Sequence, residues 1–137
     1  MKLIPVHPDN LNLAWKDVEK YITQGLEYGD NKYKVEDIKQ MIETECLILW
    51  VVYNDEKNQA IGCVLTEIFD YPQTRCLMIF LLAGDDFEKI VTLLPDLTSY
   101  GKSKGCERIE FYGRCGWERI LKAYNFEKIH TVMRLNI

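Results

Sequence analysis

The chain has 137 residues, of which 47% are hydrophobic and 28% are charged, and its formal net charge is −4. This length fits a single domain, 1–137, and the apolar content is enough for a packed core, which argues against a disordered chain. An acidic balance gives no general electrostatic reason to bind nucleic acid or an anionic membrane surface.

Signals for export, membrane insertion and metal binding are missing from the sequence. The first ten residues, MKLIPVHPDN, hold a short apolar run broken by two prolines, unlike a signal peptide. No apolar run of about 18 residues occurs, which argues against a membrane span. The five cysteines have no CxxC spacing. We therefore expect reduced thiols in a cytoplasmic protein, with no metal site.

Two amphipathic segments and three apolar runs fill the first half of the chain. Between Leu11 and Leu26, apolar residues recur at steps of three and four, which predicts an amphipathic helix capped by Asp9 or Asn10. Gly62, inside an apolar run, indicates a bulge or a close approach of two backbones. The patterns predict a further helix over residues 35–44 and strands over residues 2–6, 47–53 and 59–69.

The second half alternates strands and helices. After the next strand, Gly84 opens a helix that extends to near Gly105, and Pro95 should kink it. The remaining elements are strands over residues 76–83, 107–112 and 128–135, with a short helix over residues 117–124. This order, β-α-α-β-β-β-α-β-α-β, predicts an α/β (α+β) protein with a mixed central sheet.

The stretch GKSKGCERIEFYGRCGWERILKAYNFEKIHTVMR, with this element order, resembles the GCN5-related N-acetyltransferase (GNAT) superfamily. In that family a short helix closes on a lysine-x-glycine-phenylalanine corner before the last strand. Residues 122–126 (KAYNF) occupy this corner, and Asn125 stands where glycine is usual. Asparagine tolerates a left-handed backbone, so the turn is retained. The resemblance implies a GNAT-like mixed central β-sheet of six to seven strands flanked by about four helices.

The resemblance also implies an activity, which is transfer of an acetyl group from acetyl-CoA to the amine of a small molecule or a protein. In the family, backbone N–H groups of a glycine-rich turn after the fourth strand hold the CoA diphosphate. Free N–H groups and the helix dipole make such a turn an anion site. The residues that correspond to this cofactor site are Leu81, Leu82, Ala83, Gly84, Asp85, Asp86 and Phe87.

The turn after the fourth strand departs from the family pattern. It has one glycine, no arginine or glutamine, and carboxylates at Asp85, Asp86 and Glu88. Asp85 and Glu88 have the spacing of a capping box, which predicts Asp85 as the helix N-cap. A capping carboxylate competes for the N–H groups, and a like charge at ~4 Å repels phosphate by roughly 1 to 4 kcal/mol. Either the turn is an ordinary helix cap, or it is a rearranged CoA site in which Lys89 or the strand backbone compensates.

The catalytic groups of the family also have no direct counterpart here. Many members carry a tyrosine five residues before the corner phenylalanine, and that position is Leu121 in this chain. Tyr124 is our candidate acid, with a packing role as the alternative for it and for Tyr112. A general base would come from the middle strands, where Glu67 is our candidate and the other carboxylates are Asp70 and Glu110.

Two classes of function follow from these observations. The first is a GNAT-like N-acyltransferase. The second is a catalytically silent GNAT-fold protein with a binding or structural role, similar to virion-associated proteins of bacteriophages. Trp117 with Arg114 and Arg119 forms either an aromatic-basic patch or a hydrophobic anchor for the last helix. The edge strands, Trp50 and Trp117 also leave open a protein partner or a homo-oligomer.

Overall fold

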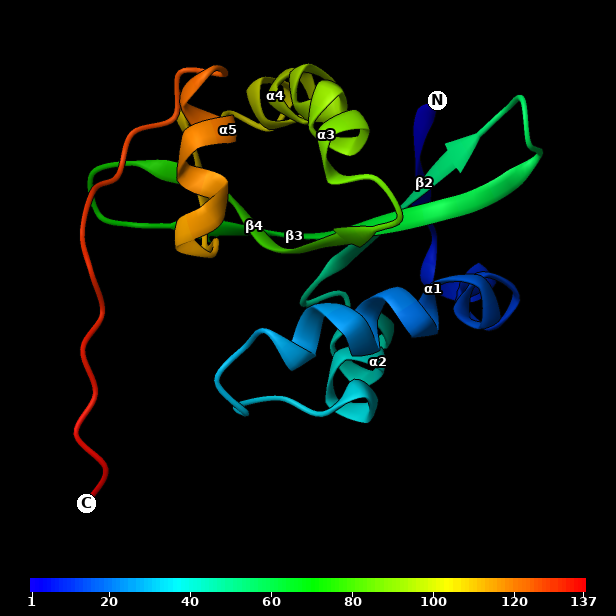
Figure 1. Ribbon diagram of the computed structural model, residues 1–137, viewed down its shortest axis with the longest axis horizontal. Helices are drawn as coiled ribbons and strands as arrows, with labels where there is room; N and C mark the ends of the chain where they lie inside the picture. The colour runs from blue at the N-terminus through cyan, green and yellow to red at the C-terminus, as the bar shows by residue number, and fades with distance from the viewer.

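The computed structural model describes all 137 residues and contains one β-sheet between two layers of helices (Figure 1). The sheet has five strands in the spatial order β1-β2-β3-β4-β5. Neighbouring strands are antiparallel, except that β4 and β5 are parallel. The strands are β1 (Lys2–Val6), β2 (Ile48–Asn54), β3 (Gln59–Asp70), β4 (Arg75–Gly84) and β5 (Arg108–Phe111). The predicted α/β (α+β) class with a mixed central sheet is confirmed.

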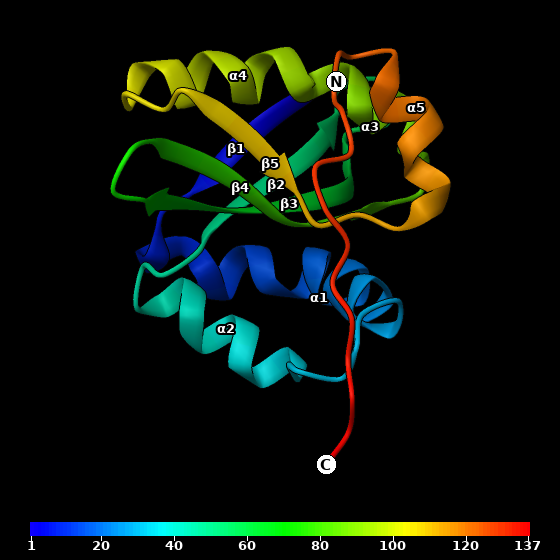
Figure 2. The same cartoon turned by 90° about the vertical axis from the view of Figure 1, so that its left-hand side faces the viewer.

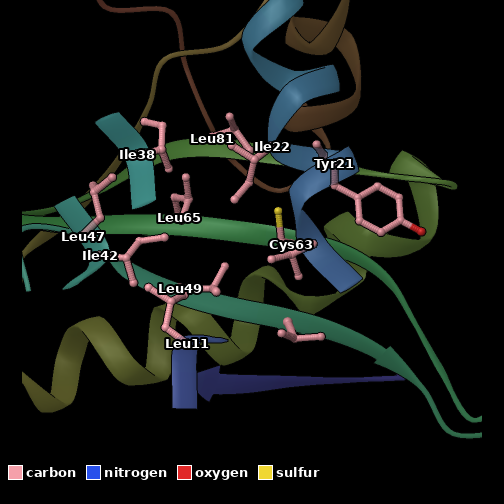
Figure 3. Packing of buried hydrophobic residues seen from close by; sticks show 13 residues of the cluster. Leu11, Tyr21, Ile22, Ile38, Ile42, Leu47, Leu49, Cys63, Leu65 and Leu81 are labelled. Atoms are coloured by element: carbon pink, nitrogen blue, oxygen red, sulfur yellow. The ribbon is translucent and has the colours of Figure 1, made fainter. Parts of the chain in front are cut away.

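Helices α1 (Leu11–Glu27) and α2 (Val35–Glu43) cover one face of the sheet (Figure 2). The predicted apolar stripe of α1 is confirmed, because Leu11, Val18 and Ile22 are at most 1% exposed. These side chains pack with buried residues of α2, β2, β3 and β4, as Figure 3 shows. Burying one such aliphatic side chain stabilises the fold by roughly 1.5–3 kcal/mol, so the stripe fixes α1 on the sheet.

Three helices cover the opposite face: α3 (Phe87–Ile90), α4 (Leu94–Ser103) and α5 (Glu118–Lys122) (Figure 2). Their buried side chains, including Ile90 and Leu97, form a second cluster with the other face of the strands. The sheet is therefore covered on both faces. This arrangement explains why its central strands are almost continuously apolar.

The prediction of one kinked helix after Gly84 is wrong. A 3-10 turn over Val91–Leu93 separates α3 from α4. Pro95 lies in the first turn of α4, where a residue without an N–H group costs no helical hydrogen bond. The proline therefore begins a new helix instead of bending a continuous one.

Gly62 lies where two backbones approach closely, as its position in the sequence predicted. The register of β2 and β3 shifts there, because Val52 pairs with Gly62 and Tyr53 pairs with Ala60. A Cβ atom on Gly62 would lie 2.5 Å from the carbonyl oxygen of Ala83. Only glycine leaves room for this contact between β3 and β4.

The C-terminal residues do not form the predicted closing strand. Residues 128–135 take an extended course but pair with no strand, so the sheet has five strands instead of six to seven. The segment passes the end of the sheet on its way to the α1–α2 side, and Arg134 Nη2 lies 2.5 Å from Asp30 Oδ2 (Figure 2). A strand needs a neighbour for its backbone groups, and this path gives the segment none.

The corner before this segment does match the prediction. Asn125 has a φ of +67°, the left-handed conformation expected at the glycine position of the corner. The N–H of Asn125 donates to the carbonyl of Lys122 at 3.0 Å, and the N–H of Phe126 donates to that of Leu121 at 3.2 Å. These bonds end α5 and turn the chain away from it.

Candidate active site

β4 and β5 lie side by side over only four residues of each strand. Their pairing begins with Cys76 opposite Arg108 and ends with Ile79 opposite Phe111. β4 then continues to Gly84, whereas β5 ends. Residues 80–84 of β4 therefore have no strand on this side, and their outward backbone N–H and C=O groups are available to a ligand.

A bulge in β4 turns the strand away from β5. Ile79 pairs with Thr66 and Leu81 pairs with Leu65, so Phe80 has no residue opposite to it in β3. A bulge of this kind bends its strand and increases the local twist. The two parallel strands separate at this residue, and a groove opens between them.

The groove has a volume of about 1660 Å³. Its walls come from β4, β5, the end of α1 with the loop that follows, α5 and the start of the C-terminal segment. Pockets for drug-sized ligands have volumes of roughly 300–1,000 Å³, so this groove has room for a long ligand. By contrast, the outer face of α1 has only a shallow, entirely polar depression.

Two of the three candidate bases line the groove. Glu67, Met78 and Glu110 lie opposite one another in one row across β3, β4 and β5, on the face that also carries α1 and α2. Burial raises the pKa of Glu67. The third candidate, Asp70, accepts two hydrogen bonds from Arg75, at 2.6 and 3.2 Å, in the turn between β3 and β4. Asp70 is therefore a structural residue of that turn.

Several aromatic side chains line the groove, and no motif in the sequence pointed to them. The rings of Tyr33 and Phe80 meet edge to face with centroids 5.1 Å apart. Arg114 reaches from the start of the α5 region to the end of α1, with its Cζ 3.7 Å from the ring centre of Tyr28 and 4.8 Å from that of Trp117. These contacts connect the two walls of the groove.

Trp117 also anchors the region before α5. Its ring stacks on Phe87 with centroids 4.5 Å apart and meets Phe111 edge to face at 5.1 Å. The hydrophobic-anchor interpretation of Trp117 is confirmed by these contacts. The alternative, an exposed aromatic-basic patch with Arg114 and Arg119, is not borne out, because Trp117 is half-buried and only Arg114 lies over its ring.

The prediction that Asp85 caps the helix after β4 is wrong, because Asp86 does so. The Asp86 Oδ1 atom accepts a hydrogen bond from the N–H of Lys89 at 3.2 Å, and the Asp86 backbone is extended, as at most N-caps. Glu88 then lies in the first turn of α3, without the capping-box spacing. Lys89 Nζ is 3.7 Å from Asp86 Oδ2, which partly balances that charge.

Asp85 is held by a tyrosine from α1 that lies 64 positions earlier in the chain. The Tyr21 hydroxyl donates to Asp85 Oδ2 at 2.9 Å, and the Asp85 N–H donates to the carbonyl of Ile61 at 2.9 Å. In Figure 3 the Tyr21 hydroxyl points away from the aliphatic cluster. Burial, together with the bond to Asp85, raises the pKa of Tyr21 to about 12. This bond joins α1 to the turn.

Gly84 is required by packing, independently of any ligand. A Cβ atom on Gly84 would lie 2.2 Å from Ile90 Cδ1 and 2.7 Å from the carbonyl oxygen of Ile61. The side chain of Ile90, the last residue of α3, therefore occupies the space that a side chain at position 84 would need. The glycine at this position is explained by the contact between β3, β4 and α3.

The structure brings most, but not all, of the predicted site residues to the groove. Glu67 lines the groove from β3, and Tyr124 lines it from the turn after α5. Tyr124 also packs against the buried cluster beneath α5. Asp85 and Asp86 do not line the groove. The predicted cofactor residues at the groove are Leu81, Leu82, Ala83, Gly84 and Phe87.

The potential metal ligands and the cysteines are dispersed over the structure. No group of three or more His, Cys, Asp or Glu side chains is placed to hold a metal ion. All five cysteines have free thiols, and burial raises the pKa of Cys63 to about 12. None of the helices combines the length and apolar character that crossing a membrane requires.

The sequence matches no protein-family model and no curated protein, but its structure resembles solved ones. The tetramutant of BH1408 protein from Bacillus halodurans has a TM-score of 0.73 at 13% identity, with 100% of each chain covered. A predicted acetyltransferase from Clostridium acetobutylicum, solved with acetyl-CoA, has a TM-score of 0.69 at 15% identity, covering 98% of this chain and 95% of that one. Glucosamine-6-phosphate N-acetyltransferase from Arabidopsis thaliana has a TM-score of 0.65 at 11% identity, covering 98% and 97%.

The chain therefore has the fold of the GNAT superfamily, as the resemblance in its sequence predicted. The likeness extends over the whole chain, because each of these three comparisons covers at least 98% of it. At these identities the likeness concerns the fold alone.

The residues present fit the acyl-pantetheine arm of acetyl-CoA better than its diphosphate. The groove and the unpaired edge of residues 80–84 fit the narrow acyl-pantetheine arm, whose amides need backbone partners. The turn fits the diphosphate poorly. Asp86 already takes the N–H of Lys89, Asp85 adds a second carboxylate, and α3 is a single turn of four residues with little dipole.

Proposed function

We propose that the protein is an N-acetyltransferase that binds the acyl arm of acetyl-CoA in the β4–β5 groove and acetylates an amine there. The observation that carries this proposal is the separation of β4 from β5 at Phe80, with a carboxylate, Glu67, on the adjoining wall. Two neighbours in fold support it, one solved with acetyl-CoA and one named for acetylating glucosamine-6-phosphate.

Glu67 acts as the general base in this proposal. Acetyl-CoA would supply an acetyl group activated as a thioester. The Glu67 carboxylate orients the acceptor amine and takes up the proton that its nitrogen loses as the C–N bond forms. Because burial raises the pKa of Glu67, this carboxylate is a stronger base than one in water.

Tyr124 acts as the acid on the opposite wall. The sulfur of acetyl-CoA would need a proton when its bond to the acetyl carbon breaks, and the Tyr124 hydroxyl would supply it. The unpaired edge of residues 80–84 would hold the pantetheine amides, so that Glu67 and Tyr124 can act on the reacting atoms.

A second candidate, a GNAT-fold protein without catalysis, is favoured by one specific observation. The turn after β4 carries two carboxylates, and one of them takes an N–H that a diphosphate would need. In this case the groove serves as a binding or structural surface. The two candidates differ in whether acetyl-CoA binds at all.

Calorimetry with acetyl-CoA separates the candidates, and thiol release with a panel of primary amines then tests catalysis. Saturation at a hundredfold excess over the dissociation constant should stabilise the protein by ~2.7 kcal/mol against unfolding. The acetyltransferase requires both binding and amine-dependent thiol release. Absence of binding at millimolar acetyl-CoA excludes it and favours the second candidate, whereas binding without thiol release for any tested amine contradicts both.

A further inference from the structure

The C-terminal segment keeps the pattern of a strand although it pairs with none. Its odd-numbered residues from 129 to 137 are apolar except for Thr131, and its even-numbered residues are polar except for Val132. Met133 is 91% exposed and Leu135 is 85% exposed. The apolar side of this alternating segment is therefore exposed to solvent. An exposed apolar surface of this kind is typical of one that is buried when the protein binds a partner.

The outer edge of β5 is the free edge of the sheet nearest to this segment. β5 is the last strand in the sheet order and pairs only with β4. The backbone groups on its other side have no strand partner. Such an edge is a template for one more strand.

The two faces of β5 match the two faces of the segment. Ile109 and Phe111 face the cluster beneath α4 and α5 and are only partly buried. A strand whose apolar side chains lay beside them would extend that cluster. Its basic side chains, Lys128, His130 and Arg134, would then lie on the face that carries Glu67 and Glu110.

The segment does not reach this edge within its own chain. It runs past the carboxyl end of β5 toward α1 and α2, where it is tied by the pair of Arg134 with Asp30 (Figure 2). Both side chains of this pair are nearly half exposed, and exposed pairs of this kind hold a segment weakly. The segment is thus extended, weakly held and directed away from the β5 edge, whose two faces match its own.

We propose that residues 128–135 add a strand to the β5 edge of a second copy of this chain. A two-fold exchange uses each segment and each edge once, so it closes as a dimer and buries both apolar faces. Residues 126–132 already line the groove, so the strand from the second copy extends the groove wall beside Glu110. This interaction is independent of whether acetyl-CoA binds.

Light scattering on the full chain tests the exchange. From about 1 to about 100 μM the wild type should have twice the mass of one chain. The double variant Met133→Asp/Leu135→Asp should raise the dissociation constant of the dimer at least about tenfold. Leu13→Asp is the matched control, because Leu13 on α1 is also largely exposed, at 71%, and that variant should remain dimeric.

A second variant tests strand pairing itself. Thr131→Pro removes one N–H group from the segment while it leaves the apolar side chains in place, and it should also dissociate the dimer. Slow hydrogen exchange at residues 108–111 should accompany the dimer and be lost in both variants. A monomeric wild type, a dimer unaffected by both segment variants, or a monomer with protected residues 128–135 would overturn the proposal.

Discussion

The two ends of the β4–β5 groove are built in opposite ways. At the turn end, polar groups are satisfied within the protein, since Asp85 pairs with Tyr21 and Asp86 caps α3. At the other end, the Glu67 carboxylate takes part in no ion pair or side-chain hydrogen bond, and burial raises its pKa. Groups that are already paired hold the fold together, whereas an unpaired group in a groove remains free to meet a ligand.

The largest expected effect is that of removing the Glu67 carboxylate on the rate of acetylation. Glu67→Gln should lower the rate of amine acetylation by about 100-fold or more, because it removes the general base and leaves the shape of the side chain. Thiol release under saturating acetyl-CoA measures this rate. Glu56→Gln in the β2–β3 turn is the matched control and should leave it unchanged.

The pH dependence of Glu67 gives a separate readout. The rate should rise with pH through the pKa of Glu67, so the acidic limb lies above the ordinary pKa of glutamate. Because the folded-state pKa is raised, ionised Glu67 disfavours folding at neutral pH, and this penalty disappears as the pH falls through that pKa. Glu67→Gln should therefore stabilise the protein slightly at neutral pH. A destabilised variant without the acidic limb would mean that Glu67 is structural.

Packing at the turn end is the next largest effect. Gly62→Ala should reduce the free energy of unfolding by about 1–3 kcal/mol, because the new Cβ would lie 2.5 Å from the Ala83 carbonyl oxygen. Urea denaturation measures the loss. Gly116→Ala is the control, since no atom lies within 4 Å of that position. Equal stability of the two variants would contradict the close approach of β3 and β4.

A smaller effect is expected from the bond between α1 and the turn. Tyr21→Phe should cost about 1 kcal/mol of stability at neutral pH, since one hydrogen bond to a carboxylate is lost. The wild type should also lose stability as the pH rises from 10 toward about 12, because the pKa of Tyr21 is raised in the folded protein. The variant should lack this part of the alkaline loss. An identical alkaline profile in both proteins would contradict the burial of this hydroxyl.

Much of the fold was predictable because it depends on local patterns. The apolar spacing of α1 and the branched residues of β2 determine which surfaces are buried, and the structure buries those surfaces. The left-handed Asn125 was also predictable from the corner around it. Residues 128–135 have an equally clear pattern. A pattern can identify a strand but not the partner that the strand requires.

The candidate site was less predictable because it depends on contacts between distant residues. Asp85 appeared to be the helix cap from its spacing to Glu88, but Tyr21 from α1 binds it and Asp86 takes the cap. The bond between these distant elements leaves no signal in the local sequence. The same holds for Arg114, which stacks on Tyr28 at the far end of α1.

The smallest predicted effect concerns the turn after β4, where two variants of Asp86 separate the role of its charge from its role as helix cap. Asp86→Asn keeps an N-cap of similar quality and removes one negative charge, so the affinity for acetyl-CoA should rise about fivefold, or about 1 kcal/mol. Asp86→Ala removes the charge as well, but it should also cost about 1 kcal/mol of stability through loss of the cap. Calorimetry and thermal unfolding measure the two quantities. Unchanged affinity in both variants would mean that the turn lies away from the bound diphosphate.

The comparison of acetyl-CoA with S-acetylpantetheine tests the central claim most directly. The groove is expected to hold the acyl-pantetheine arm while the turn adds little, so calorimetry should give dissociation constants within about tenfold, or about 1.4 kcal/mol. Failure of both ligands to bind would contradict the claim. A preference for acetyl-CoA of about a thousandfold or more would also contradict it, because the turn would then be the main binding site.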